Sequence, residues 1–247
     1  MVKLNIPKRL KSKYLKVYTD IGTRLLLEKK NYAAVLSNSI IKTPEKNSDL
    51  DIIVVTNKKY WQREHLSING VFIELFFYPE KELLKSFLKE KDYQDMHMVS
   101  RGFVMFDKTN CLNNLKEVAS SEYKKGPRLN KENILYSKYM IWDQHQDIID
   151  IINTDKLGAI ALMHKSLWRA IELYFNLRNK WFCKPKKMLS SIYNLDKEKY
   201  LLLNKFYSLN SKKISIMYKI YREIISSIIK PYDIDKPFEW KSKKYKS

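Results

Sequence analysis

The chain has 247 residues and a formal net charge of +20, and this length suffices for one large or two ordinary domains. No run approaches the roughly 18 apolar residues of a membrane span, and the first residues lack the apolar stretch of a secretory signal peptide. Since the two cysteines, Cys111 and Cys183, supply neither a disulfide framework nor a metal site, the sequence excludes a disulfide-rich secreted domain and predicts a cytoplasmic protein without a membrane partner.

The first part of the chain predicts a helix followed by strands. Apolar side chains recur at helical spacing from Lys13 to Lys30, which indicates an amphipathic helix. A short apolar run from Tyr32 to Leu36 predicts a strand, and the small polar residues Ser37 to Ser39 follow it. A second strand is predicted from Ile52 to Val55.

A hairpin is predicted next. The segments Glu64 to Ile68 and Val71 to Phe77 flank Asn69-Gly70, and Asn-Gly favours the positive φ angles of a type I′ turn. A short helix is expected from Glu80 to Glu90, and a further strand from Gly102 to Phe106. Mixing of helices and strands with a hairpin indicates an α+β domain with a small mixed sheet.

The second half of the chain predicts helices almost throughout. Gly126 and Pro127 both interrupt regular structure, so the expected domains are residues 1–125 and 126–247. The expected fold class is therefore α+β, with a sheet-containing N-terminal domain and an all-α helical bundle at the C-terminus. The predicted helices run from Lys131 to Asn153, Ala159 to Phe182, Asp196 to Leu209 and Lys212 to Ile229.

Three carboxylates stand at unusual positions on two of the strands. Asp49 and Asp51 are two residues apart at the start of the second strand, so their side chains project to the same face. Glu74 lies within an apolar run between Phe72 and Phe76, where an acid is costly unless a cation holds it. If the two strands are neighbours, the three acids converge on a site suited to Mg²⁺, which commonly binds substrate phosphates as well.

The order of these features resembles the DNA-polymerase-β-like nucleotidyltransferase superfamily. That pattern has a strand, a Gly-Ser-type turn, an Asp-x-Asp at a strand start and a third acid on a later strand. Ser37-Asn38-Ser39, Ser48-Asp49-Leu50-Asp51-Ile52 and Ile73-Glu74-Leu75 carry the resemblance, which extends over residues 12–107. Within the superfamily the chain is most similar to two-domain antibiotic nucleotidyltransferases, which adenylylate aminoglycosides or lincosamides. Asn38 replaces the family's glycine, and Asn tolerates positive φ.

The resemblance implies a role for each of these residues. Asp49 and Asp51 would hold two Mg²⁺ ions, and Glu74 would be a third ligand or the base for the acceptor hydroxyl. Two metals can clamp the attacking and leaving oxygens of an in-line displacement at phosphorus. The triphosphate of the NTP, expected to be ATP, would be bound by the turn residues Ser37, Asn38 and Ser39.

The helical domain contributes two further candidate groups. Asp143, Asp147 and Asp150 share one helix face by their spacing. In kanamycin-type transferases a carboxylate of the helical domain helps deprotonate the acceptor, and by resemblance Asp143 or Asp147 would do so here. The alternative is a solvated acidic face. Lys184 and Lys186 are candidate contacts for phosphates of the bound nucleotide.

The basic excess does not by itself identify a nucleic-acid-binding protein. Eight of the 47 basic residues are Arg, whereas bidentate phosphate recognition uses Arg, and the excess is spread over both halves of the chain. A solvated basic surface is the favoured interpretation, so a nucleic acid ranks behind a small molecule as partner.

The predicted function is Mg²⁺-dependent transfer of a nucleoside monophosphate from an NTP to a hydroxyl of a small acceptor, such as an aminoglycoside or lincosamide antibiotic, with release of pyrophosphate. The expected partners are the NTP and the acceptor, and the chain is expected to be a monomer or a homodimer. Two alternatives stay open. One is a nucleotidyltransferase that acts on tRNA or on a protein, as toxin-like members do, and the other is a catalytically silent nucleotide- or RNA-binding module.

Overall fold

The structure is a computed structural model, and it describes residues 2–37, 39–42 and 48–241. Contacts within the chain divide it into two compact units, residues 1–125 and 126–247. The described residues of the first unit form a five-stranded sheet with helices, and those of the second unit form helices without a sheet. The α+β fold class with a mixed sheet is confirmed.

The sheet combines parallel and antiparallel pairs. β2 and β4 pair in parallel, whereas β1–β2, β1–β5 and β3–β4 are antiparallel. The predicted hairpin is confirmed, because Asn69 and Gly70 have φ angles of 52° and 70° and join β3 to β4. The strands are β1 (Asn31–Leu36), β2 (Leu50–Thr56), β3 (Gln62–Ile68), β4 (Val71–Pro79) and β5 (Phe103–Asp107), in the order β3-β4-β2-β1-β5.

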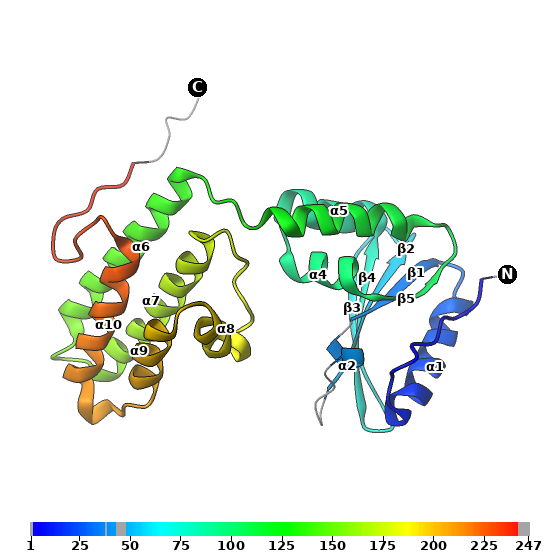
Figure 1. Cartoon of the computed structure of the whole chain (residues 1–247), viewed down its shortest axis with the longest axis horizontal. Helices are drawn as coiled ribbons and strands as arrows, with labels where there is room; N and C mark the ends of the chain where they lie inside the picture. Colours follow the sequence, from blue (N-terminus) through cyan, green and yellow to red (C-terminus); the bar gives the residue numbers. More distant parts are fainter. Residues whose placement is uncertain (1, 38, 43–47, 242–247) are drawn as a thin grey trace. The chain divides into compact units, whose positions relative to one another are not determined.

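Helices cover both faces of the sheet (Figure 1). On one face α1 (Ser12–Leu27) shares a core with alternate strand residues such as Leu50 and Ile52. Ile53 and Val55 are fully buried toward the opposite face, where α3 contacts β2 and β4, and α4 and α5 contact β1. The elements on that side are α3 (Glu80–Lys85), the π-helical turn η1 (Ser86–Glu90), α4 (Tyr93–Arg101) and α5 (Cys111–Lys125).

The short helix α2 (Ser39–Lys42) and two longer helices of this unit, α4 and α5, were not predicted, and one predicted helix is divided. α4 buries only Asp95, Met96 and Val99, so its apolar pattern is too sparse to stand out in the sequence. α5 has its apolar residues among Asn, Ser and Glu, which weakens the helical period. The helix expected from Glu80 to Glu90 begins as α3 and continues as η1.

The second unit buries an extensive apolar core between its helices. The helix predicted from Ala159 to Phe182 ends instead at Asn176, shortly before Asn179 takes a left-handed φ of 53°. α8 was not predicted. No helix of the described residues is long and apolar enough to cross a membrane. The α-helices are α6 (Lys131–Ile151), α7 (Lys156–Asn176), α8 (Met188–Leu195), α9 (Lys197–Tyr207) and α10 (Ile214–Ile229), with short 3-10 turns at η2 (Pro185–Lys187) and η3 (Ser211–Lys213).

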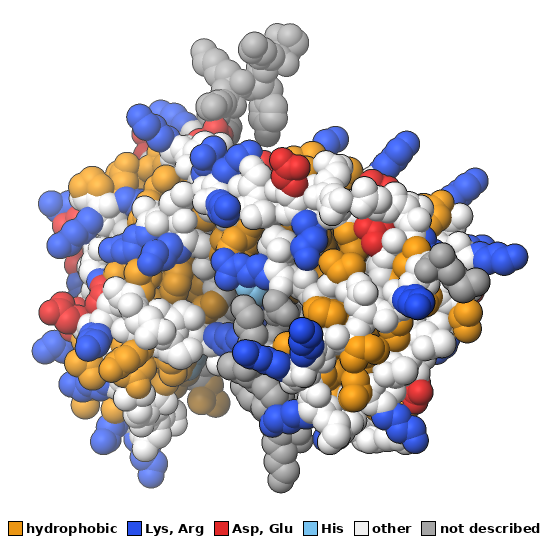
Figure 2. Space-filling view, turned by 45° about the vertical axis from the view of Figure 1, so that its right-hand side comes forward, with side chains coloured by type: hydrophobic (Ala, Val, Ile, Leu, Met, Phe, Trp, Pro, Cys, Tyr) orange, Lys and Arg blue, Asp and Glu red, His pale blue; other side chains and the backbone are white. Residues whose placement is uncertain are grey.

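The basic side chains do not gather in one patch on the face seen in Figure 2. Lys and Arg are spread over that face among apolar and uncharged atoms. This distribution accords with a solvated basic surface and provides no concentrated track for a polyanion on that face.

Candidate functional site

The sheet brings two of the predicted acids side by side. In the parallel pair β2–β4, Asp51 lies opposite Glu74, and residues opposite each other on neighbouring strands point to the same face. Asp49 precedes β2 and stands two residues before Asp51, so it is expected on that face as well. Both aspartates are half-buried. The condition on which the site was predicted, that the two strands are neighbours, is met.

The turn after β1 reaches the same end of the sheet. The backbone N–H of Ser37 donates a hydrogen bond of 2.8 Å to the carbonyl oxygen of Asp51. The Ser37 and Ser39 hydroxyls lie 3.1 Å apart, and Ser39 begins the short helix α2 (Ser39–Lys42), which lies at this end of the sheet (Figure 1). Two hydroxyl groups therefore accompany the carboxylates.

Glu74 is held by two side chains of the neighbouring strand β3. Its carboxylate accepts a hydrogen bond of 3.2 Å from Arg63 Nη2 and lies 3.3 Å from His65 Nδ1. The Arg63 guanidinium also stacks over the Phe76 ring, 4.7 Å from its centroid. His65 lies opposite Glu74, Glu74 lies opposite Asp51, and Ser37, the residue after β1, is hydrogen-bonded to the Asp51 backbone. We call these four residues the sheet row.

The expectation that Glu74 is buried between phenylalanines was wrong. Its side chain is 25% exposed, and Phe72 is 65% exposed, because the hairpin presents this face to solvent. The expected cation is present as Arg63, and the imidazole of His65 lies beside it, although neither residue was predicted. Counting back from the Asn69-Gly70 turn would have placed His65 opposite Glu74, since a two-residue turn sets the register of a hairpin.

The donors at this site suit Mg²⁺ in part. Within the described ranges, no three His, Cys, Asp or Glu side chains form a group placed to hold a metal ion. Asp51 on the sheet face, with Asp49 two residues earlier in the chain, supplies hard oxygen ligands, which are the donors that Mg²⁺ prefers. Glu74 lies beside them, and each of its carboxylate oxygens already contacts one side chain, Oε2 with Arg63 and Oε1 with His65.

The remaining predicted site residues lie elsewhere. Asn38 falls outside the described residues. Asp143 is half-buried on α6, in the second unit. Lys184 and Lys186 are exposed at the turn η2, in the same unit. Their roles stay predictions.

Comparisons with known proteins found a structure of limited similarity. No family model matches the chain, and no curated protein matches it. A crystal structure of a nucleotidyltransferase-like protein from Exiguobacterium sibiricum 255-15 is 14% identical, with a TM-score of 0.49, and the alignment covers 86% of this chain and 73% of that one. The residues of the sheet row, and not this similarity, support the function proposed next.

Proposed function

We propose that this chain is a Mg²⁺-dependent nucleotidyltransferase that moves a nucleoside monophosphate from an NTP to a hydroxyl group and releases pyrophosphate. The observation that carries the proposal is the parallel register in which Asp51 lies opposite Glu74, with Asp49 two residues earlier on the same strand end. Clustered carboxylates on one sheet face are the donors such a reaction needs.

Each residue would have a definite task. Asp49 and Asp51 would hold Mg²⁺, which when bound neutralises charge on the phosphate oxygens. The Ser37 and Ser39 hydroxyls would donate hydrogen bonds to the triphosphate. Glu74 would accept the proton of the acceptor hydroxyl. The hydroxyl oxygen of the acceptor would then bond to the α-phosphorus, and the bond from that phosphorus to pyrophosphate would break.

The NTP and the acceptor follow from the resemblance of residues 12–107 to antibiotic nucleotidyltransferases. ATP is the first nucleotide to test, and an aminoglycoside or a lincosamide is the first acceptor. A tRNA or a protein hydroxyl is the next acceptor to assay. Fold alone does not determine the acceptor, because one fold hosts many substrates.

The proposal is tested by nucleotide binding and by pyrophosphate release. Thermal unfolding would be followed with ATP, GTP, CTP and UTP, each with and without Mg²⁺, on the wild type, Asp51→Asn and the exposed control Asp20→Asn. A ligand at a hundredfold excess over its Kd stabilises the native state by about 2.7 kcal/mol. We expect a Mg²⁺-dependent shift that Asp51→Asn loses and Asp20→Asn keeps. No shift with any nucleotide would refute the proposal.

A second candidate is a nucleotide-binding module that does not catalyse transfer. The observation that favours it is the pairing of Glu74 with Arg63 and His65, which occupies the expected base or third ligand. Mg²⁺-dependent ATP binding without pyrophosphate release for any acceptor class would support this candidate. Pyrophosphate release that requires both Asp51 and an acceptor would support the nucleotidyltransferase function.

A further inference from the structure

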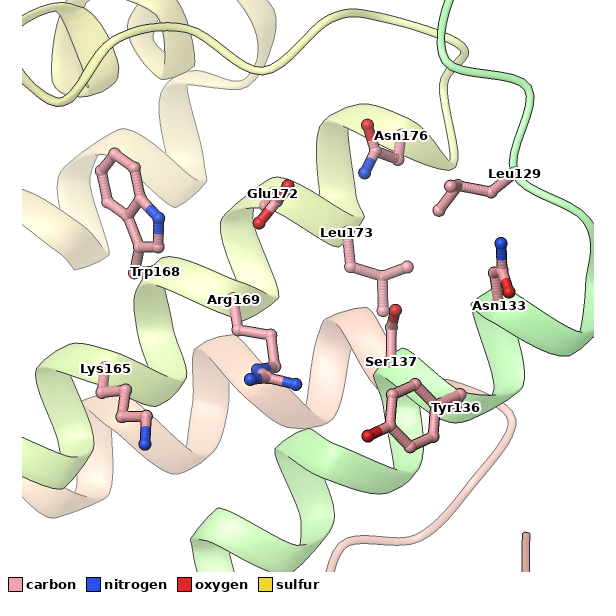
Figure 3. A pocket seen from close by; sticks show the side chains of 10 residues that line it. All are labelled: Leu129, Asn133, Tyr136, Ser137, Lys165, Trp168, Arg169, Glu172, Leu173 and Asn176. Atoms are coloured by element: carbon pink, nitrogen blue, oxygen red, sulfur yellow. The ribbon is translucent and has the colours of Figure 1, made fainter. Parts of the chain in front are cut away.

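The second unit contains a cavity that the proposed reaction does not use. It lies between α6 and α7, is open to solvent and has a volume of about 580 Å³ (Figure 3). This is within the range of about 300–1,000 Å³ that is usual for small-molecule sites. Both aromatic and charged side chains line it, among them Tyr136 from α6 and Lys165, Trp168, Arg169 and Glu172 from α7.

Two cations of this cavity make no ion pair with the residues that the structure describes. Lys165 and Arg169 are four residues apart on α7, where like charges face the same side of a helix and repel each other. Neither side chain forms an ion pair or a hydrogen bond with the described part of the chain, although Arg169 is half-buried. Glu172 is a single carboxylate among them, so the charged lining is net positive. An anionic group is the ligand that such a pair attracts.

Two aromatic rings of the cavity lining are held by neighbouring rings. Trp168 packs against Phe182 with ring centroids 4.6 Å apart, and Tyr136 packs against Trp240 at 4.7 Å. A ring that is already fixed loses little side-chain freedom when a ligand ring packs on it. The cavity therefore combines a place for an anion with preorganised surfaces for a planar group.

Polar side chains line the end of the cavity away from Lys165 and can form hydrogen bonds to a ligand. The side chains of Asn133 and Asn176 line that end, and Glu172 lies between them and Arg169, as Figure 3 shows. Glu172 can accept hydrogen bonds from amino or hydroxyl groups, and the two amides can both donate and accept. A nucleoside monophosphate offers the matching set, because it has a phosphate, a planar base and sugar hydroxyls.

We propose that the α6–α7 cavity binds a nucleoside monophosphate, with the phosphate at Lys165 and Arg169 and the base against the Tyr136 ring, which Arg169 points toward in Figure 3. The site lies within the second unit and needs no divalent metal. The net positive lining would repel a polycation such as an aminoglycoside at this position.

The test is isothermal titration of the full chain with AMP in EDTA, using the wild type, Lys165→Gln and Arg169→Gln. Lys205→Gln, an exposed lysine on α9, is the matched control. Loss of one charge-assisted contact should weaken AMP binding about tenfold or more in each cavity variant and leave the control unchanged. Adenosine and ribose 5-phosphate should each bind more weakly than AMP. Circular dichroism would establish that each variant is folded.

Two results would overturn the proposal: no binding of AMP at millimolar concentration, or wild-type affinity in both Lys165→Gln and Arg169→Gln. The variants also separate the two sites. Asp51→Asn should keep metal-free AMP binding while it loses the Mg²⁺-dependent response to ATP. Arg169→Gln should lose metal-free AMP binding and keep the Mg²⁺-dependent response to ATP. The failure of one proposal would therefore leave the other proposal to be tested by its own variant.

Discussion

Asp51 on β2 and Glu74 on β4 lie directly opposite each other in a parallel strand pair, with both side chains on one face of the sheet. Like charges in this position destabilise a sheet unless a cation lies between or beside them. Arg63 and His65 supply positive or hydrogen-bonding groups to Glu74 from β3. A divalent ion bound beside them would likewise reduce the repulsion between the two carboxylates. This pair is therefore central to the proposed function.

Glu74→Gln should reduce Mg²⁺-dependent stabilisation by ATP while changing the stability of the free protein by at most about 1 kcal/mol, because its ion pairs are partly exposed. Glu64→Gln is the matched control, since Glu64 lies on the same hairpin, faces α1 and pairs with Arg24 at 3.5 Å. Unfolding temperature against Mg²⁺ concentration at fixed ATP measures both variants. Equal responses in the two variants would show that Glu74 takes no part in metal or nucleotide binding.

Gly102→Ala should destabilise the first unit by at least about 2 kcal/mol, because overpacking a buried site forces its neighbours to move. A Cβ at Gly102 would overlap the Val35 side chain and the Met98 carbonyl oxygen. Gly70→Ala is the comparison: nothing lies within 4 Å of its added Cβ, but its φ of 70° disfavours any side chain, so a cost of about 1 kcal/mol is expected. Urea unfolding gives both values. A Gly102→Ala cost no larger than that of Gly70→Ala would contradict this packing argument.

Asp95→Asn should stabilise the first unit at neutral pH more than at acid pH. Burial, reinforced by the nearby Asp92 charge, raises the pKa of Asp95 to about 6, although hydrogen bonds to Tyr78 and Ser86 act in the opposite direction. The folded state therefore binds this proton more tightly than the unfolded state, whose pKa is near 3.8. Its contribution to stability is full below that pH and is lost as the pH rises through 6, by up to roughly 3 kcal/mol.

The measurement is the difference in unfolding free energy between Asp95→Asn and the wild type at pH 4 and at pH 7.5. The difference should be more favourable to the variant at the higher pH. Asp20→Asn, an exposed aspartate on α1, should show no such dependence. A difference for Asp95→Asn that does not change with pH would contradict the raised pKa.

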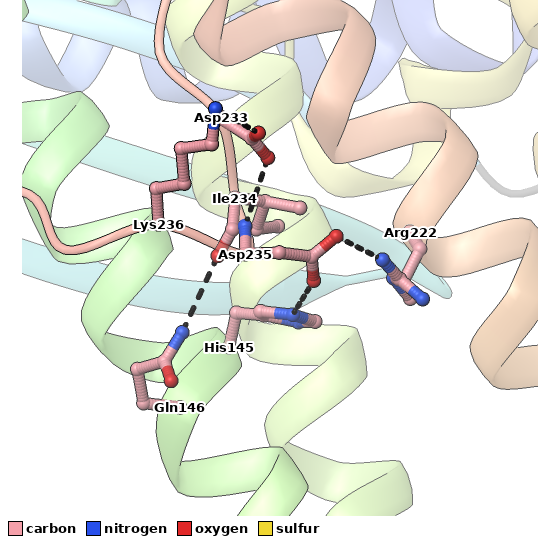
Figure 4. Close-up of polar contacts among 7 residues, drawn as sticks. All are labelled: His145, Gln146, Arg222, Asp233, Ile234, Asp235 and Lys236. Carbon is pink, nitrogen blue, oxygen red and sulfur yellow. Dashed lines mark hydrogen bonds and ion pairs between the residues drawn. The ribbon is translucent and has the colours of Figure 1, made fainter.

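His145→Phe should remove a loss of stability that the wild type shows in acid. Burial, together with the positive charge of Arg222, lowers the pKa of His145 to about 4, and Asp235 opposes that shift only in part (Figure 4). The His145 Nε2 to Asp235 Oδ1 distance is 3.8 Å, which is longer than a hydrogen bond. The ring stacks on Tyr218 with centroids 5.8 Å apart, a contact that Phe can retain.

Because the unfolded pKa of His145 is near 6.5 and the folded pKa is lower, its stabilising effect is complete above pH 6.5. It is lost as the pH falls toward 4, by up to roughly 3 kcal/mol. Tryptophan fluorescence is a suitable probe, since four of the five tryptophans lie in residues 126–247. A wild type and variant with parallel stability curves from pH 7 to pH 4 would show that His145 does not titrate in this way.

Local sequence signals predicted each of the five strands that the structure describes in the first unit. The Asn69-Gly70 turn identified the hairpin because only a few residue types adopt its positive φ angles, and apolar runs located β1, β2 and β5 within a few residues. α4 was missed because tertiary contacts, rather than a strong apolar period, stabilise it, with its N-terminus capped by Asp92. The end of α7 was misplaced because apolar residues continue beyond Asn176, where the chain leaves the helix.

The sequence by itself determined which side chains share a face: Asp49 with Asp51, Glu74 with Phe72 and Phe76, and Lys165 with Arg169, because strand and helix periods are properties of the backbone. Only the tertiary structure decided which faces meet. The parallel pairing that sets Asp51 against Glu74 joins strands separated along the chain by β3 and its hairpin turn. The exposure of Glu74 and the cavity between α6 and α7 depend equally on how whole elements pack. Such packing minimises exposed apolar surface over the entire unit, so no local window of sequence contains it.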